Sequence, residues 1–230
     1  MTRYDFLLFD ADNTLLDFDA NEAVSIRKTL AHFGVEPTED MVRLYSQVNR
    51  GFWQRYNQGE LTQAQVLVQR FDAFFARLGR SCDARAVEGF YREQLGRGNQ
   101  VIPGAQELLA ELKDSYCLIM VTNGVASTQY PRLRQSGIGQ YFEYVFVSEE
   151  IGAHKPEKAF FDYVSAHVPD FVRRRALIIG DSISSDIQGG INAGIDTCYF
   201  DRHGEGCGDI IPTVSVKDYD GLRHFLGIGE

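Results

Sequence analysis

Two aspartates separated by one residue directly follow an apolar run near the start of the chain. The segment LLFDADNT (7–14) places Asp10 and Asp12 where a buried strand would end. Two carboxylates that face one pocket repel each other strongly unless a divalent ion or a shared proton relieves them. A carboxylate held on such an ion stays ionised and can attack phosphorus, while its neighbour can protonate a leaving alkoxide. The pair therefore predicts metal-assisted phosphoryl transfer.

Polar side chains also follow three later apolar runs. They supply a hydroxyl, an amide, a lysine and two more acids: Thr122, Asn123, Lys155, Asp181 and Asp186. In doubly wound sheets, ligands bind outside the carboxyl ends of the strands, so these groups are expected to meet at one edge. Oxygen donors without a Cys–His set favour Mg²⁺ over zinc, and a lysine nearby would neutralise charge on the transferring group.

The elements that must position these residues alternate along the chain. Short, almost continuous apolar runs are typical of strands buried on both faces, and amphipathic stretches between them predict covering helices. This alternation predicts an α/β fold with a doubly wound parallel sheet. The expected strands are 4–10, 116–122, 144–148, 176–181 and 196–200, and the expected helices are 104–113, 125–136, 157–167 and 184–193.

One interval breaks the alternation. About a hundred residues separate the first two expected strands, too many for one crossover, and they contain four amphipathic segments. These segments are 20–34, 38–57, 61–79 and 83–97. We therefore expect a core of residues 1–17 and 98–230 interrupted by a four-helix-type cap domain at 18–97.

Four short motifs in order resemble those of the haloacid dehalogenase superfamily. They are DADNT (10–14), VTNG (121–124), HKP (154–156) and GDSISSD (180–186). The resemblance covers essentially the whole chain. It implies a Rossmann-like core, a helical cap of the C1 type between the first two motifs, and Mg²⁺ as cofactor.

The resemblance also implies a role for each matching residue. Asp10 would be the nucleophile and a magnesium ligand. Asp12 would be the general acid and base, with its backbone carbonyl on the metal. Thr122, Asn123 and Lys155 would hold the phosphoryl group. Asp181 would bind magnesium, and Asp186 would act through water or orient Lys155.

The second acid of the first motif separates two chemistries within the superfamily. Halide departs without protonation, and the superfamily's dehalogenases do without that acid, whereas a leaving alkoxide needs a proton. Asp12 therefore favours phosphoester hydrolysis over 2-haloacid dehalogenation. Phosphomutases also carry the second acid, so a β-phosphoglucomutase-like enzyme remains an alternative, as does a non-catalytic binding protein on the same scaffold.

The expected cap contains an aromatic segment that suggests a substrate. The segment VNRGFWQRYNQGELT (48–62) holds Trp53 and Tyr56, whose rings could stack on a nucleobase, and Asn49, whose amide could read its edge. Packing of the two rings within the cap is the alternative. The segment resembles that of a bacterial pyrimidine 5′-nucleotidase subgroup. We therefore expect a 5′-nucleotidase acting on nucleoside monophosphates, with a sugar-phosphate or phosphoglycolate phosphatase as the alternative.

The composition of the chain argues against two classes of binding partner, nucleic acids and membranes. The 230-residue chain is 44% hydrophobic and 24% charged, with a formal net charge of −9. Nucleic-acid and membrane-surface binding favour basic patches, so we expect neither. No apolar run approaches the roughly 20 residues of a membrane span, and the N-terminal residues do not read as a signal peptide. A cytoplasmic enzyme is expected, and monomer or homodimer remains open.

Overall fold

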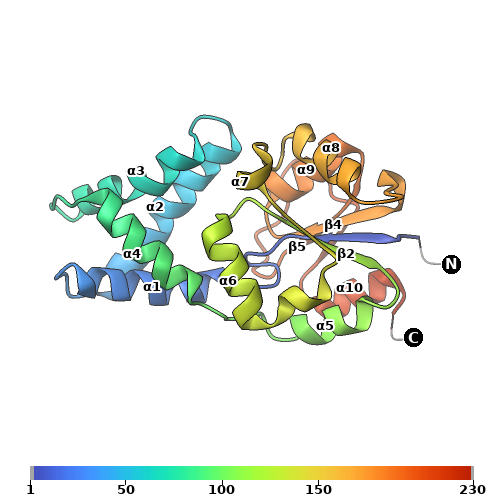
Figure 1. Ribbon diagram of the computed structural model, residues 1–230, viewed down its shortest axis with the longest axis horizontal. Coiled ribbons are helices and arrows are strands. Elements are labelled where there is room, and N and C mark those ends of the chain that lie inside the picture. Colours follow the sequence, from blue (N-terminus) through green and yellow to red (C-terminus); the bar gives the residue numbers. More distant parts are fainter. Residues whose placement is uncertain (1–2, 229–230) are drawn as a thin grey trace. The chain divides into compact units, whose positions relative to one another are not determined.

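The computed structural model describes residues 3–228 and divides the chain into two units (Figure 1). An α/β unit contains the residues up to Asp17, Val101–Ala126 and the residues from Ser136 onward. A helical unit contains Phe18–Gln100 and Ser127–Gln135. Residues 98–100 and 127–135, which the sequence-based division placed in the core, have most of their contacts within the helical unit.

A six-stranded parallel sheet forms the centre of the α/β unit, with the order β3-β2-β1-β4-β5-β6. Every residue of β1 and β4 is buried, as expected for strands covered on both faces. This sheet confirms the predicted fold class. The strands are β1 (Phe6–Phe9), β2 (Cys117–Thr122), β3 (Tyr144–Val147), β4 (Ala176–Gly180), β5 (Asp196–Phe200) and β6 (Val214–Val216).

The strand order brings three of the sequence motifs together. β1 lies between β2 and β4, with Phe9 paired in register with both Met120 and Ile179. The chain builds the sheet outward in one direction through β2 and β3, and in the other through β4 to β6. The order therefore reverses beside β1, and such a switch point forms the ligand crevice of open α/β sheets.

Helices cover both faces of the sheet, with α8 and α9 on one side and α5 and α10 on the other (Figure 1). Phe160, Phe161 and Val164 of α8 are fully buried in the apolar cluster that includes strand residues of β1, β2 and β4. The helices are α5 (Ala105–Leu112), α7 (Ser148–Ile151), α8 (Lys158–His167), α9 (Gln188–Ala193) and α10 (Tyr219–Leu226), with short turns η1 (Ile138–Tyr141), η2 (Arg173–Arg175) and η3 (Ile183–Ile187).

Four helices pack into the bundle of the helical unit. Side chains close three of their N-termini, because Thr38, Thr62 and Asp83 accept hydrogen bonds from backbone amides of the first turn. The bundle encloses its own apolar cluster. Its helices are α1 (Phe18–His32), α2 (Glu39–Asn57), α3 (Gln63–Arg77) and α4 (Ala84–Gly96).

The middle of α6 (Ala126–Ser136) belongs to the helical unit through contacts with the ends of this bundle. The Gln135 side chain donates to the carbonyl of Gly96 at 3.0 Å, and the buried Arg132 guanidinium lies over the ring of Phe18. Chain order alone could not predict this grouping, because α6 lies between two strands of the sheet in sequence.

A buried polar layer crosses the bundle with one residue from each helix. Asn49 donates to Glu22 at 2.6 Å and accepts from Arg70 at 2.7 Å, and Arg70 donates to Glu88 at 2.7 Å. All four side chains are buried. Buried charges are tolerated when they are paired and hydrogen-bonded, so Arg70 is the group that makes this layer possible.

Replacing Arg70 by methionine is expected to destabilise the bundle by about 3–5 kcal/mol, because Glu88 would lose its buried partner. Burial already raises the pKa of Glu88, although Arg70 opposes this shift. Without Arg70 the carboxyl would hold its proton more tightly in the folded state than in the unfolded state. The penalty should therefore grow as the pH rises from acidic to neutral. Chemical denaturation followed by the fluorescence of Trp53, the single tryptophan of the chain, measures the loss.

Arg92→Met is the matched control for this substitution. Arg92 contacts the same glutamate at 3.8 Å, but its side chain is 40% exposed. Exposed ion pairs contribute about 0–1 kcal/mol. Equal losses in the two variants would contradict the importance of the buried pair.

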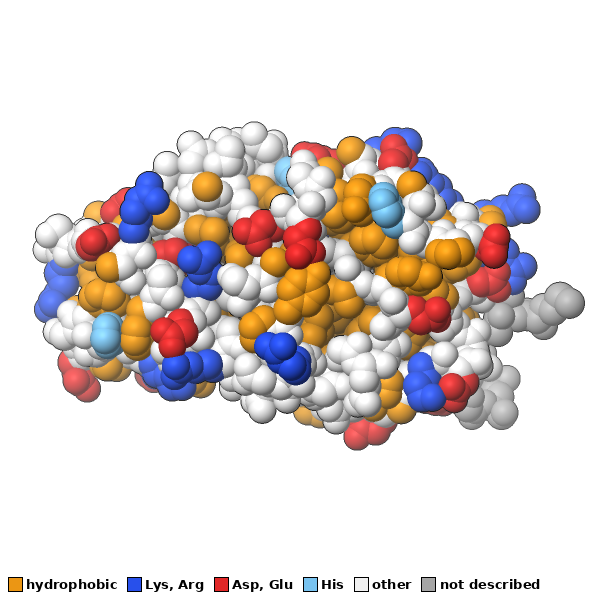
Figure 2. Space-filling model, viewed as in Figure 1, with side chains coloured by type: hydrophobic (Ala, Val, Ile, Leu, Met, Phe, Trp, Pro, Cys, Tyr) orange, Lys and Arg blue, Asp and Glu red, His pale blue; other side chains and the backbone are white. Residues whose placement is uncertain are grey.

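On the face shown in Figure 2, acidic and basic side chains are interspersed. Within residues 3–228, no helix has both the length and the apolar character that a membrane crossing requires.

Candidate active site

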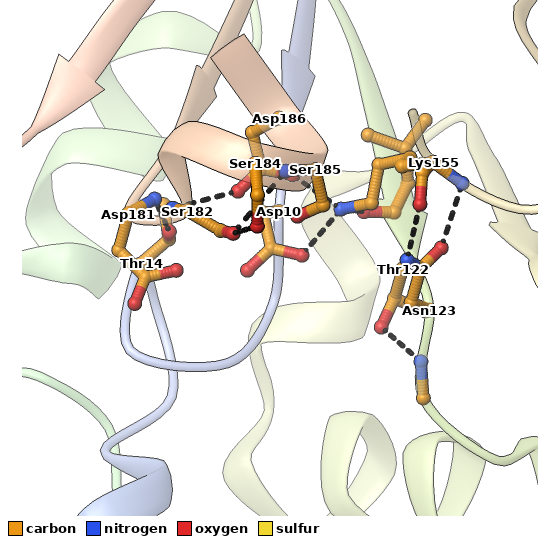
Figure 3. Close-up of polar contacts among 12 residues, drawn as sticks. Asp10, Thr14, Thr122, Asn123, Lys155, Asp181, Ser182, Ser184, Ser185 and Asp186 are labelled. Carbon is orange, nitrogen blue, oxygen red and sulfur yellow. Dashed lines mark hydrogen bonds and ion pairs between the residues drawn. The ribbon is translucent and has the colours of Figure 1, made fainter. Parts of the chain in front are cut away.

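The predicted site residues of the α/β unit meet at the carboxyl ends of three neighbouring strands (Figure 3). Asp10 follows β1, Thr122 ends β2 and Asp181 follows β4. Lys155 reaches the same place from the loop after α7, and Asp186 reaches it from the turn η3.

Lys155 is the centre of the contacts. Its Nζ donates to Asp10 Oδ1 at 2.6 Å, to Asp186 Oδ1 at 2.7 Å and to the carbonyl of Val121 at 2.8 Å. The side chain is 1% exposed. Three acceptors satisfy the three donors of the ammonium group, so the lysine is fixed with its charge against Asp10.

The acids of the site outnumber this one lysine. Burial, together with the charges of Asp186 and Asp12, raises the pKa of Asp10 to about 7, although Lys155 opposes the shift. Burial and the charges of the neighbouring carboxylates, Asp10 first among them, also raise the pKa of Asp181 well above its usual value. Burial opposes the charge of Lys155, but Asp10 and Asp186 together raise the pKa of the lysine above its ordinary value. The arrangement favours a further positive charge.

The carboxylates provide a place for that charge. Oxygens of Asp10, Asp181 and Asp186 lie within 4.8 Å of one another. Asp186 is occupied on both oxygens, since it accepts from Lys155 and, at 3.0 Å, from the backbone amide of Ser182. Among residues 3–228, no hydrogen bond reaches the Asp181 carboxylate or the second oxygen of Asp10. An all-oxygen donor set of this kind fits Mg²⁺.

A tight turn fixes Asp12 close to Asp10. Asn13 has a positive φ of 60°, a conformation that asparagine tolerates better than most residues. The carbonyl of Ala11 accepts from the amides of Leu15 and Leu16 at 3.0 and 2.8 Å. The chain therefore turns back directly after Asp12, whose side chain is half-buried.

Thr14 connects this turn to the residue that follows β4 and to helix α10. Its hydroxyl accepts from the amide of Asp181 at 3.1 Å. Its carbonyl accepts from the hydroxyl of Tyr219 in α10 at 2.7 Å. Sequence reasoning missed Tyr219, which is buried and 205 residues away from Thr14.

Gly180 is required at the end of β4 because Asp186 approaches its backbone closely. A Cβ at this position would lie 2.3 Å from the carboxyl carbon of Asp186. The glycine of the GDSISSD motif therefore makes room for the acid that ends the same motif. This spacing was the one signal in the sequence that linked the two residues.

The side chain of Asn123 holds the lysine loop. Its Nδ2 donates to the carbonyl of Lys155 at 2.8 Å, and its Oδ1 accepts from the amide of Lys155 at 2.9 Å. The hydroxyl of Thr122 accepts from the amide of Gly124 at 3.0 Å. Both ends of the Asn123 side-chain amide therefore bind the backbone of Lys155, whereas the sequence-based expectation was that this residue would hold the phosphoryl group.

The three cap residues have different surroundings in the helical unit. Asn49 is buried in the polar layer with both ends of its amide engaged. Tyr56 is buried, and Trp53 is half-buried with its ring edge-to-face on Tyr56 at 5.5 Å between centroids. Of the three, Trp53 has the most accessible side chain.

The parallel α/β sheet brings three carboxylates and a buried lysine together at its carboxyl edge, the place where open α/β enzymes bind their ligands. The sequence matches the family described as haloacid dehalogenase-like hydrolase over residues 4–194. The chain belongs to this family, as its four motifs predicted.

Proteins similar to nearly the whole chain include the following three. The solved structure of the HAD-hydrolase YfnB from Bacillus subtilis, bound to magnesium, has a TM-score of 0.93 and 41% identity, covering 98% of this chain and 100% of that one. The pyrimidine 5′-nucleotidase PynA of Streptococcus pneumoniae is 36% identical, covering 97% of this chain and 95% of PynA. The pyrimidine 5′-nucleotidase YjjG of Escherichia coli is 32% identical, with coverages of 97% and 98%.

Proposed function

We propose that this hydrolase is a magnesium-dependent phosphomonoesterase that forms an aspartyl-phosphate, and that its substrates are pyrimidine nucleoside 5′-monophosphates. The observation that carries the proposal is the pair of acids in one turn. Asp10 has one oxygen fixed by Lys155, and Asp12 stands two residues further on. Such a pair supplies a nucleophile and a separate proton donor.

In the first half of the proposed reaction, the second oxygen of Asp10 attacks phosphorus. A bond forms between this oxygen and phosphorus while the bond to the ester oxygen breaks. Asp12 gives its proton to the departing alkoxide, which leaves as the alcohol. Lys155 keeps Asp10 oriented and offsets negative charge as the phosphoryl group transfers.

In the second half, water attacks the phosphorus of the aspartyl-phosphate. Asp12, now ionised, takes a proton from the water. The bond between phosphorus and Asp10 then breaks, which releases inorganic phosphate and restores the Asp10 carboxylate. The same residue therefore acts first as acid and then as base, so Asp12 begins the next cycle protonated.

Asp10 and Asp181 would hold the magnesium ion, and Asp186 would hold Lys155 in place. When bound, the ion offsets the mutual repulsion of the acids and the charge of the phosphoryl oxygens. The all-oxygen donor set, and the magnesium in the similar structure of YfnB, support this assignment.

The choice of nucleotides rests on the two pyrimidine 5′-nucleotidases that resemble almost the entire chain, including its helical unit. We propose that the helical unit acts as the cap that selects the substrate. Within the helical unit, Trp53 is the candidate for stacking on a base, because its side chain is only half-buried and part of it remains accessible to a ligand. Base reading by Asn49 is not part of this proposal, since the polar layer occupies its amide.

A panel of phosphorylated metabolites tests the function. The panel contains nucleoside monophosphates varied in base and sugar, sugar phosphates, phosphoglycolate and β-glucose 1-phosphate. We expect the highest kcat/KM with pyrimidine nucleoside monophosphates, and release of inorganic phosphate as the measured product.

The same panel tests the metal. Removal of divalent ions by EDTA is expected to abolish turnover, because the acids of the site would lose their counter-charge, and added Mg²⁺ should restore it. Full activity after exhaustive chelation would contradict the magnesium assignment.

Two other outcomes of the panel would contradict the nucleotidase assignment. A higher kcat/KM with a sugar phosphate than with any nucleotide would identify a sugar-phosphate phosphatase. Isomerisation of β-glucose 1-phosphate without phosphate release would indicate a mutase.

A further inference from the structure

We infer that Glu149 is a positioning residue that holds the phosphate-binding turn 122–126 in its working conformation. The inference deepens the proposed function and rests on it. Glu149 Oε2 accepts a hydrogen bond at 2.8 Å from the backbone amide of Ala126, which lies 23 residues away in sequence. Ala126 is the first residue of α6.

The start of α6 lacks a cap of its own. The first amides of a helix have no partner within the helix, and a polar side chain at the N-cap position usually satisfies one of them. In α6 this position is occupied by Val125, whose apolar side chain makes no capping bond. Glu149 supplies the missing acceptor from α7, and a carboxylate is favoured at a helix N-terminus.

The same short segment of chain holds the turn at two places. Residues 148–155 contribute Glu149, which binds Ala126, and Lys155, whose backbone binds the side chain of Asn123. Within the turn, Thr122 binds the amide of Gly124. Each end of the turn is thus tied to the element that also carries the reactive lysine.

The position of Ala126 in the chain explains why its hydrogen bond to Glu149 would matter for the phosphate-binding turn. Ala126 is the last residue of the α/β unit before the chain enters 127–135, which belong to the helical unit. A turn that binds phosphate must keep its amides fixed to within a fraction of an ångström, and misplacement by about 1 Å can cost about 100-fold in rate. The bond from Glu149 fixes the turn at the point where the chain changes units.

Glu149→Ala removes this bond, and Glu149→Gln is the matched control. Because the side chain of Glu149 is exposed, we expect both variants to fold, and the melting temperature checks this. Glutamine keeps a carbonyl acceptor for the Ala126 amide while removing the charge. We expect Glu149→Ala to raise KM for the best substrate, and Ki for inorganic phosphate, by about tenfold in parallel, with a smaller change in kcat. Glu149→Gln should stay close to the wild type.

Direct titration of inorganic phosphate, with Mg²⁺ present, distinguishes a failure of the role of Glu149 from a failure of the proposed function. Unchanged KM and Ki in Glu149→Ala, in an active enzyme, would overturn the role of Glu149 and leave the proposed function standing. Equal effects of alanine and glutamine would also overturn it, because charge rather than the hydrogen bond would then matter. A wild-type protein that neither hydrolyses the panel nor binds phosphate would remove the proposed function, and this inference with it. Glu149→Asp, which shortens the side chain by one methylene, gives the same test if alanine lowers the melting temperature.

Discussion

Asp10→Asn is expected to reduce turnover by at least about 10⁴-fold, the scale on which loss of a covalent nucleophile acts in hydrolases. An amide oxygen is a poor nucleophile and cannot form the aspartyl-phosphate. The protein should still fold, because asparagine has nearly the same shape and Lys155 keeps its bonds to Asp186 and to the carbonyl of Val121. Phosphate release from the best nucleotide of the panel measures the loss, and thermal melting checks the fold.

Asp5→Asn is the matched control for this variant. Asp5 precedes β1 at the opposite end of the strand from Asp10, and its exposed carboxylate pairs with Arg175. The same chemical change there should leave turnover unaltered. Turnover close to the wild type in Asp10→Asn, with asparagine at position 10 verified by mass spectrometry, would contradict the nucleophile assignment.

The sequence predicted the sheet well because its strands are buried on both faces. Such strands are continuous apolar runs, so the expected strand at 196–200 matches β5, and the expected strand at 144–148 exceeds β3 by one residue. The edge strand β6 was missed, since three residues after a glycine-rich loop give no periodic signal.

The meeting of the motifs could be predicted, but the partners of individual side chains could not. Paired acids after one strand, and a lysine after another, imply a shared edge once the sheet is parallel. An asparagine, in contrast, donates and accepts equally well toward a ligand or toward the protein. Asn123 binds the backbone of Lys155 and Asn49 binds Glu22 and Arg70, and only the folded chain brings these partners within reach.

The grouping of α6 was also beyond the sequence. Its contacts to Gly96 and Phe18 join residues that are far apart in sequence and carry no shared motif. Tyr219 and Glu149 belong to the same category, because each acts on a backbone atom far away in sequence. Motifs identify groups that react, whereas supporting residues that bind backbone atoms are constrained mainly by geometry.

Asp12→Asn is expected to separate substrates by the quality of their leaving group. A nucleoside alkoxide needs a proton as it departs, so the first turnover with a nucleoside monophosphate should slow by about 10²–10⁴-fold. p-Nitrophenolate departs without that help, and its first turnover should stay close to the wild-type rate. Rapid-mixing measurements of the first turnover isolate this step from the later hydrolysis.

The hydrolysis step gives the second half of the test, because Asp12 also activates the attacking water. With p-nitrophenyl phosphate, the Asp12→Asn variant should release about one equivalent of p-nitrophenol per site in a burst and then stall. The stalled protein should carry an acid-stable mass increase of one phosphoryl group on the peptide that contains Asp10. Equal slowing of the first turnover with both substrates would contradict the proton-donor role, because a residue that only orients Asp10 or the metal would affect every leaving group alike.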